Sequence, residues 1–229
     1  NPIAAGTSLN YIAPMVNPCV RYDAGTATSQ PAGPVDPVSA TGGYWVPTTN
    51  LNNGMLTNAI IDDMSTGLNA WQITDQNVLS SGGVLDYRMK IDQASDNFAH
   101  ANGWRLMART RFVDSFLSTA ADQAVIYCDT GLGIRYGILF SQDSNGDLNA
   151  ALLGGSTYVL TSDTFSYHTH VLAYDPATGL VSYYFDGRLV VGNYTGQVAS
   201  GYDGVAFGSA SSASTGQMNY NLVQFDVLN

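Results

Sequence analysis

The chain has 229 residues, of which 11% are charged, and its formal net charge is −10. Ordinary soluble domains carry roughly a quarter charged residues, so most of the polar surface here must come from Ser, Thr, Asn, Gln and Gly. The negative charge argues against nucleic acid as a partner and against docking on anionic lipid, because both require a basic patch. No apolar run approaches the roughly eighteen residues that span a bilayer, which argues against membrane insertion. This profile is typical of a secreted or cell-surface β-protein.

Residues 1–56 differ in composition from the rest of the chain. They contain seven of the eight prolines, separated by Gly, Ala, Ser and Thr, and such a segment resists both helices and central strands. We therefore expect an extended N-terminal arm that packs on the domain or on a neighbouring subunit, where it would support self-assembly. Cys19 of this arm and Cys128 form a disulfide in one interpretation and are two unpaired buried thiols in the other.

Residues 57–229 carry strand patterns at short intervals, separated by Gly- and Asn-rich turns. Apolar and polar side chains alternate in several of them, with the period of two that predicts a strand with one buried face. Asp186-Gly187 is a dipeptide that two-residue hairpin turns favour. Only residues 115–122 have a pattern that allows a helical turn. The expected strands cover residues 70–73, 85–91, 104–113, 123–128, 133–141, 147–153, 157–161, 166–174, 180–185, 204–208 and 219–228. We predict an all-β fold, an antiparallel β-sandwich or jelly roll.

Three segments resemble the laminin-G-type domains of the concanavalin A-like lectin and glucanase superfamily. They read IIDDMSTGLNAWQI at residues 60–73, HTHVLAYDPATGLVSYYFDGRLV at residues 168–190 and GVAFGSASSASTGQMNYNLVQFDV at residues 204–227. The resemblance covers most of residues 57–229 and has no counterpart for the N-terminal arm. It implies two stacked, curved antiparallel sheets with a face or rim loops open to glycans.

Two kinds of enzyme in this fold class require residues that can be looked for in the sequence. The glucanase branch of this superfamily uses paired Glu residues, and the chain contains no Glu, so that mechanism cannot be carried over. A polysaccharide lyase acting on an acidic glycan needs a cation for the uronate carboxylate and a His or Tyr for proton transfer. The residues that such an enzyme could use are Arg105, Arg109, Arg111, His168, His170 and Tyr136.

These lyase candidates also have structural explanations. The arginines alternate on one face of a single strand, where cross-strand Arg–Asp pairs would account for them. His168 stands where the laminin-G pattern has a His at a strand start, so the resemblance implies a scaffold role for it. His170 has no such explanation, which makes it the first residue to mutate.

Glycan binding without catalysis is the function that we favour. Aromatic rings stack on sugar rings, and Asn, Asp and Arg side chains bind the hydroxyl groups. Trp71 and Trp104 fall on the apolar sides of strands and are expected in the core. The residues that we expect to bind glycan are Tyr44, Trp45, Tyr194, Tyr202 and Arg109.

A cation site and an assembly role complete the set of hypotheses. Asp143, Asn145 and Asp147 place three oxygen ligands close together, as calcium would accept, although Asn145-Gly146 between two strands also predicts a hairpin turn. We expect no cofactor other than such a structural calcium ion. The sequence thus leaves three functions open: a glycan-binding domain, a lyase, and a structural subunit of a surface layer, filament or virion assembled through residues 1–56.

Overall fold

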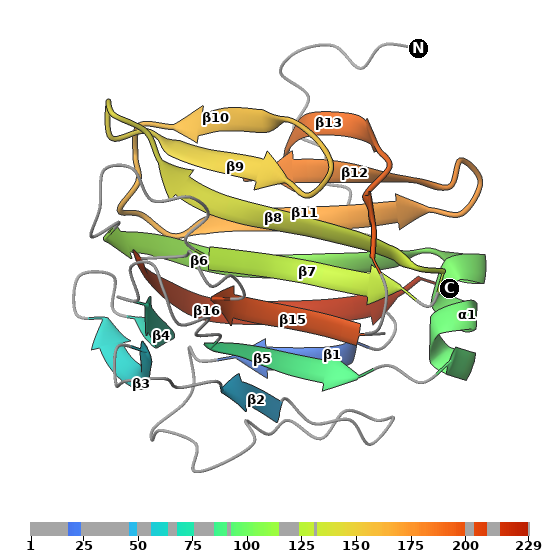
Figure 1. Cartoon of the computed structure of the whole chain (residues 1–229), viewed down its shortest axis with the longest axis horizontal. Helices are drawn as coiled ribbons and strands as arrows, with labels where there is room; N and C mark the ends of the chain where they lie inside the picture. Colours follow the sequence, from blue (N-terminus) through green and yellow to red (C-terminus); the bar gives the residue numbers. More distant parts are fainter. Residues whose placement is uncertain are drawn as a thin grey trace.

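The computed structural model describes the backbone of residues 18–23, 46–49, 56–63, 68–75, 85–90, 93–114, 124–130, 132–199, 204–209 and 216–228. Side chains are described for residues 70, 72–74, 96–114, 132–199, 204–208 and 216–228. These parts form two antiparallel sheets stacked face to face, with one helix at an end of the stack (Figure 1). The predicted all-β sandwich is confirmed.

The first sheet lies at the back in Figure 1. β16 and β6 form its centre, and β1 pairs with the C-terminal half of β16 while β4 pairs with the N-terminal half. In spatial order its strands are β13 (Arg188–Tyr194), β12 (Leu180–Phe185), β11 (His168–Asp175), β6 (Trp104–Asp114), β16 (Gly216–Val227), β4 (Leu68–Asp75) and β3 (Leu56–Asp63), with β1 (Pro18–Asp23) beside β16.

The second sheet lies in front of the first in the same view. Its strands, in spatial order, are β10 (Thr157–Thr161), β9 (Leu148–Leu152), β8 (Ile134–Gln142), β7 (Ala124–Thr130), β15 (Gly204–Ser209), β5 (Leu85–Lys90) and β2 (Val46–Thr49), with β14 (Gln197–Val198) pairing with β8. Two segments of the expected arm, β1 and β2, thus pair with strands of this chain. The division into residues 1–56 and 57–229 stays a prediction, because most of residues 1–56 lie outside the described part.

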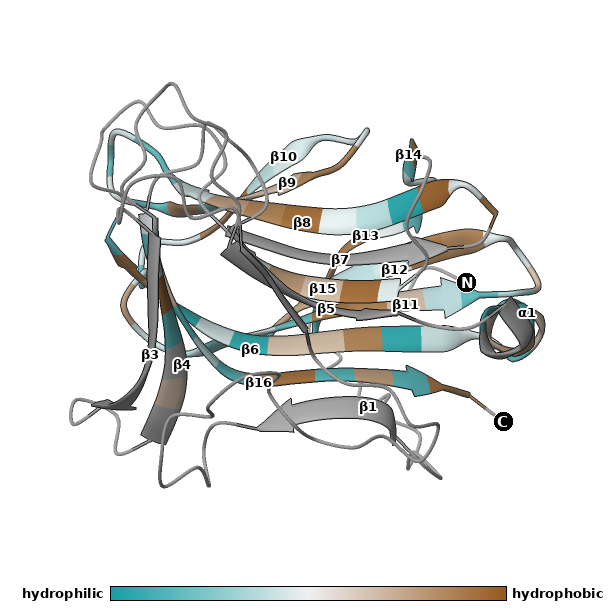
Figure 2. Ribbon diagram, turned by 60° about the horizontal axis from the view of Figure 1, so that its bottom comes forward, coloured by the Kyte–Doolittle hydropathy of each residue, from teal (hydrophilic) through white to brown (hydrophobic). Residues whose placement is uncertain are grey.

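The core fills the space between the sheets. Hydropathy alternates along much of β16 (Figure 2), and burial alternates along β6 from Leu106 to Val113, so each of these strands turns one face inward. Aromatic rings link the sheets at one end of the sandwich: Trp104 stacks on Tyr174 with ring centroids 5.6 Å apart, and it also contacts Tyr136 and Phe225. Trp104 is 1% exposed, which confirms its predicted place in the core.

The helix α1 (Gln93–Asn102) was not expected from the sequence, which pointed only to residues 115–122, a segment outside the described part. Among its described side chains, Asp96 and Ala99 are buried and are polar or small, whereas Phe98 is 51% exposed. The helix has one large apolar residue, and that residue is exposed, so its sequence contains no periodic apolar stripe. Gly103 follows the helix with a positive φ of 92°, and its amide donates to the Ala99 carbonyl, an arrangement that ends helices.

Two glycine positions shape the edge formed by β12, β13 and β14. Asp186 and Gly187 both have positive φ, 48° and 78°, as the predicted two-residue hairpin turn between β12 and β13 requires. Gly196, with φ of 76°, lies where the chain leaves β13 of the first sheet for β14 of the second.

Within the described helix no stretch is long and apolar enough to cross a membrane.

Candidate functional site

Strand β6 has two chemically opposite faces. Leu106, Ala108 and Phe112 point inward and are buried, while Arg105, Arg109 and Arg111 alternate with them on the outer face of the first sheet. The predicted sharing of one face by the three arginines is confirmed by this alternation.

The outer face of the first sheet carries a buried ion pair. Arg105 on β6 and Asp226 on β16 are register partners, with Nη2 and Oδ2 3.6 Å apart, and both side chains are almost fully buried. Gln224 Nε2 donates to Asp226 Oδ1 at 2.9 Å. The cross-strand Arg–Asp pairing considered for these arginines is therefore present at Arg105.

A ladder of side-chain amides continues this polar surface across β16 and β4. Gln217 Nε2 donates to Thr74 Oγ1 at 2.8 Å and to Gln72 Oε1 at 3.2 Å, and Gln72 Nε2 donates to Asn219 Oδ1 at 3.0 Å. Cross-strand hydrogen bonds of this kind fix side-chain orientation on a sheet face. The outer face of β4, β16 and β6 is thus polar and preorganised, and Thr74 and Asn219 on it are buried.

Arg109 and Arg111 meet two aromatic residues at the edge of that surface. The Arg109 guanidinium carbon lies 5.3 Å from the Tyr167 ring centroid, a cation–π distance, and Nη1 donates to Asn221 Oδ1 at 3.4 Å. Arg111 Nε donates to the Phe165 carbonyl, and the Phe165 side chain is 58% exposed. We call Arg109, Arg111, Phe165, Tyr167 and Asn221 the arginine face.

The arginines and the histidines lie on opposite sides of the first sheet. In the pairing of β11 with β6, Arg109 is the partner of Thr169, while His168 and His170 pair with Thr110 and Ala108. Since neighbours on a strand point to opposite faces, the histidines point inward. His170 and Tyr136 are 0% and 2% exposed. The predicted lyase site is therefore wrong in its geometry, because its proton-transfer groups and its cations cannot contact one substrate.

His170 is a core residue. Its ring lies 4.5 Å from Phe140, and Nδ1 is 2.9 Å from the Tyr183 hydroxyl. Burial, reinforced by the neighbouring His168, lowers the pKa of His170 to about 3, so the ring is neutral at physiological pH. The expectation that His170 is the residue to mutate for catalysis is overturned by this burial.

His168 joins three segments at the edge of the sandwich. Nδ1 lies 2.7 Å from Asp186 Oδ2, and Nε2 lies 2.6 Å from the Asp163 carbonyl oxygen. Burial alone would lower the pKa of His168, but these bonds to Asp186 and Asp163 outweigh it and raise the pKa. At Asp186, burial would raise the pKa of the carboxyl, but the contact with His168 and the hydrogen bond from the Thr169 amide outweigh burial and lower it. These contacts agree with the scaffold role implied by the resemblance.

Comparison with known proteins places the chain in a family. Residues 73–229, well over half of the sequence, match the family described as the lectin insertion of Vibrio cholerae sialidase. The chain belongs to this lectin-insertion family. No curated protein matches the sequence.

Solved structures show the same fold at low sequence identity. The carbohydrate esterase of the Shiga toxin-encoding bacteriophage phi24B is 15% identical, with a TM-score of 0.55 over 93% of this chain and 99% of that one. The binding domain of botulinum neurotoxin serotype D/C VPI 5993 is 9% identical, with a TM-score of 0.55 over 93% of this chain and 49% of that one. At these identities the likeness establishes the β-sandwich alone.

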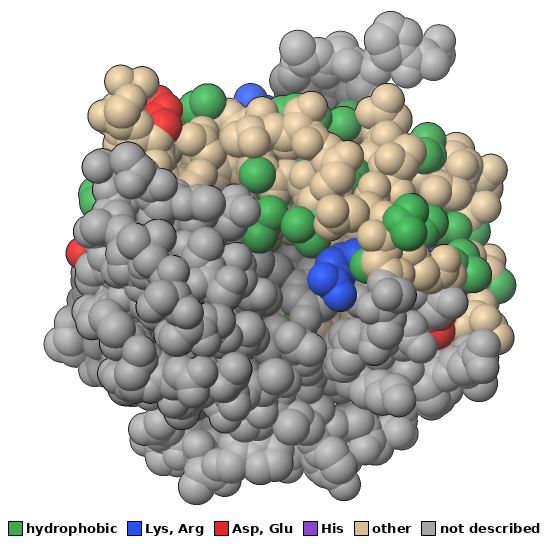
Figure 3. All heavy atoms as spheres, viewed as in Figure 1, with side chains coloured by type: hydrophobic (Ala, Val, Ile, Leu, Met, Phe, Trp, Pro, Cys, Tyr) green, Lys and Arg blue, Asp and Glu red, His purple; other side chains and the backbone are tan. Residues whose placement is uncertain are grey.

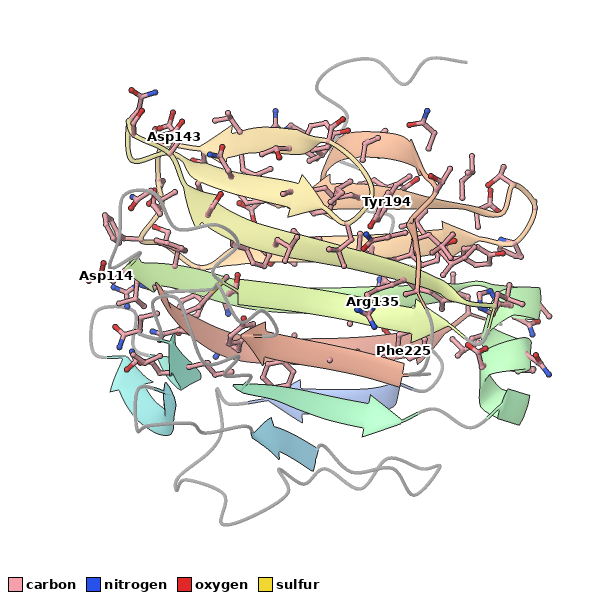
Figure 4. All side chains as sticks on the ribbon, in the orientation of Figure 1. Asp114, Arg135, Asp143, Tyr194 and Phe225 are labelled. Carbon is pink, nitrogen blue, oxygen red and sulfur yellow. The ribbon has the colours of Figure 1, made fainter. Side chains whose placement is uncertain are left out.

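Tyr194 was predicted to be an exposed platform, but in this lectin-insertion domain its side chain is buried, with 4% exposed. It ends β13 (Figure 4), and its hydroxyl accepts from the Gly137 amide at 3.1 Å and donates to the Leu153 carbonyl at 2.7 Å. Burial raises the pKa of Tyr194 to about 12. Its role is to tie the first sheet to the second. Three other predicted residues, Tyr44, Trp45 and Tyr202, lie outside the described residues.

The Asp143 segment forms the turn between β8 and β9 (Figure 4). Asp143 Oδ1 accepts from the amides of Asn145 and Asp147 at 2.8 and 3.0 Å, and the Gly146 amide donates to the Asp143 carbonyl. This is the hairpin turn that the sequence allowed, and one carboxylate oxygen is already used to hold it. No three His, Cys, Asp or Glu side chains gather closely enough for a metal in the described part of the chain. Calcium binding by Asp143, Asn145 and Asp147 stays a prediction.

Cys19 and Cys128 lie on strands of different sheets, β1 and β7. Their side chains are outside the described residues, so the disulfide stays a prediction.

The sequence pointed to Arg109 but not to its partners on the arginine face. Tyr167 and Phe165 precede β11, and Asn221 lies where the register of β16 shifts between Tyr220 and Leu222. The parity of Tyr167 with Thr169 was a usable signal, because both fall on the face opposite His168. The pairing of β11 with β6 was needed to place that face beside Arg109.

Proposed function

We propose that this chain is a non-catalytic glycan-binding domain and that the arginine face holds the glycan. The observation that carries the proposal is the pairing of Arg109 with Tyr167 on the outer face of the first sheet. Membership of a family described as a lectin insertion supports the same function.

The chemistry of the arginine face suits a sugar. Tyr167 offers a ring with an apolar face and a polar edge, the combination that stacks on a pyranose. Arg109 and Arg111 offer guanidinium donors for hydroxyl or carboxylate oxygens, and Asn221 Oδ1 already orients Arg109. The amide ladder beside them is hydrogen-bonded within itself and is buried at Thr74 and Asn219, so it supports the arginine face and is not itself the surface that a glycan would meet.

The contacts of the histidines do not favour an acyl-transfer enzyme. His168 is bound to a carboxylate and a carbonyl, His170 contacts a phenol in the core, and His100 lies 3.6 Å from Asp96 and edge-on to Tyr174. None of these contacts is with a serine hydroxyl, which the general base of an acyl-transfer site would activate.

Location and finer kinship belong to the proposal as well. A neutral-polar surface suits a secreted or cell-surface protein, and the hairpin formed by β11 and β12 lies in one of the three segments that resemble laminin-G-type domains. On the face seen in Figure 3, over the second sheet, few charged side chains are visible among the described residues.

A glycan array tests the function directly. The full chain, labelled and applied with and without added calcium, is expected to bind a subset of neutral or carboxylate-bearing glycans in the micromolar range or weaker, roughly the affinity of a shallow, polar site. Binding only with calcium would support the predicted cation site. Silence across the array under both conditions would contradict the proposal.

A further inference from the structure

The segment that carries two residues of the arginine face is fastened at several points. Residues 162–167 join β10 to β11 and include Phe165 and Tyr167. Arg111 Nε donates to the Phe165 carbonyl at 2.6 Å, and Thr164 Oγ1 donates to the Gly146 carbonyl at 2.6 Å in the β8–β9 turn. Thr164 is 1% exposed. The loop is therefore held to β6 on one side and to the second sheet on the other.

His168 adds a third fastening, and it depends on a proton. Its two ring nitrogens face two acceptors, the Asp186 carboxylate at 2.7 Å and the Asp163 carbonyl at 2.6 Å. A neutral imidazole carries one N–H, and only the imidazolium carries two. Both contacts can thus be hydrogen bonds only when the ring is protonated.

Asp186 is itself fixed in place, so the adjustment after proton loss falls on the loop. Its Oδ1 accepts from the Thr169 amide at 2.8 Å, and its own amide donates to the Thr169 carbonyl at 2.9 Å. A neutral His168 that keeps its N–H toward the carboxylate turns a lone pair toward the Asp163 carbonyl, and two acceptors at that distance repel each other.

The groups that face His168 favour the protonated ring. Asp163 faces it from the loop, Asp186 from the β12–β13 turn and the neutral His170 from β11, while its register partner on β6 is the uncharged Thr110. Phe185 packs on the ring with centroids 4.8 Å apart. The direction of the pKa, raised above the ordinary value, agrees with this environment.

We propose that His168 is a positioning residue for glycan binding: its imidazolium holds residues 162–167 so that Phe165 and Tyr167 stand beside Arg109 and Arg111, and loss of its proton weakens binding. This inference rests on the proposed function. It makes the arginine face responsive to pH through a residue on the opposite side of the sheet.

The test compares binding of the full chain to the same glycan array at about pH 5.5 and about pH 9, which lie on either side of the ordinary pKa of a histidine side chain. We expect the signal to fall roughly tenfold at the higher pH, the scale of one hydrogen bond to a charged group. Asp186→Asn removes the carboxylate but keeps a residue that tolerates positive φ, and it should move the midpoint of the transition to lower pH. His100→Gln, at the helix, should leave the midpoint unchanged. Equal signals at both pH values, or a midpoint that ignores Asp186→Asn, would overturn the inference.

An NMR titration keeps the inference separate from the proposed function. We expect the amide signals of residues 163–167 to change with the midpoint of the His168 ring itself, and with the shifted midpoint in Asp186→Asn. If the array is silent at every pH, the proposed function fails, and the amide signals alone decide whether His168 holds the loop. Loop amides that do not follow His168 would refute the positioning role, whatever the array shows.

Discussion

Gly196→Ala is expected to lower the free energy of unfolding by about 3 kcal/mol or more, which combines overpacking with left-handed strain. A Cβ at Gly196 would lie 2.6 Å from Ile134 Cγ2 and 2.9 Å from both the Arg135 carbonyl oxygen and Tyr136 Cδ1. Its φ of 76° disfavours any side chain. The close approach arises because the chain crosses from the first sheet to β8 of the second at this point.

The matched control is Gly179→Ala. Gly179 has a φ of 70°, but a Cβ there would meet nothing within 4 Å. This variant should lose only the left-handed strain, about 1–2 kcal/mol. Urea denaturation of both variants measures the difference, and equal losses would show that the crossing is not packed as described.

A second large effect is expected on the stability of the fold at acidic pH. The folded state holds the pKa of His170 near 3, below the ordinary 6.5, because the ring is buried. The unfolded chain therefore binds this proton first, so stability is complete above the unfolded pKa and falls as the pH drops below it. By about pH 5 the loss is about 2 kcal/mol from His170 alone.

The double variant His170→Phe with Tyr183→Phe should abolish this loss. Replacing both partners of a buried hydrogen bond with apolar groups of similar shape is nearly neutral, so unfolding near neutral pH should change little. His170→Phe alone leaves the buried Tyr183 hydroxyl without the partner that lies 2.9 Å from it, so at every pH it should be about 1–3 kcal/mol less stable than the double variant. Because His168 is present in all three proteins, its opposite pH dependence cancels in the comparison. Urea denaturation measures the free energy of unfolding of each protein from neutral pH to about pH 5. If that free energy falls equally with pH in the wild type and the double variant, the loss does not come from His170.

Strand alternation made the faces of β6 predictable. Trp104 and Leu106 were expected on one face and the arginines on the other, and the structure has them so. The same rule placed His168 and His170 together on one face of β11. It could not say which face, because a strand with Thr169 and Val171 on the other side reads as half-buried either way. That choice depends on the register with β6, which is a tertiary property.

Burial of polar groups limited the prediction of the site. Tyr194 was expected to be exposed because it stands in a loop-like context, beside Thr195 and Gly196. Its hydroxyl instead completes the hydrogen bonds of Gly137 and Leu153 between the sheets, and one sequence gives no sign of that partner. The helix α1 was not predicted for a related reason, because the side chains that it buries include Ala99 and Asp96 and do not form an apolar stripe.

The most direct test of the arginine face is one glycan array applied to three proteins: wild type, Arg109→Gln and Arg135→Gln. Arg135 lies on β8 (Figure 4), on the outer side of the second sheet, and serves as the matched control. We predict that Arg109→Gln reduces the signal of every bound glycan by roughly tenfold, the scale of a charge-assisted hydrogen bond with its aromatic partner. Arg135→Gln should bind like wild type. Glycan binding that survives Arg109→Gln and fails in Arg135→Gln would place the site on the second sheet and contradict this account.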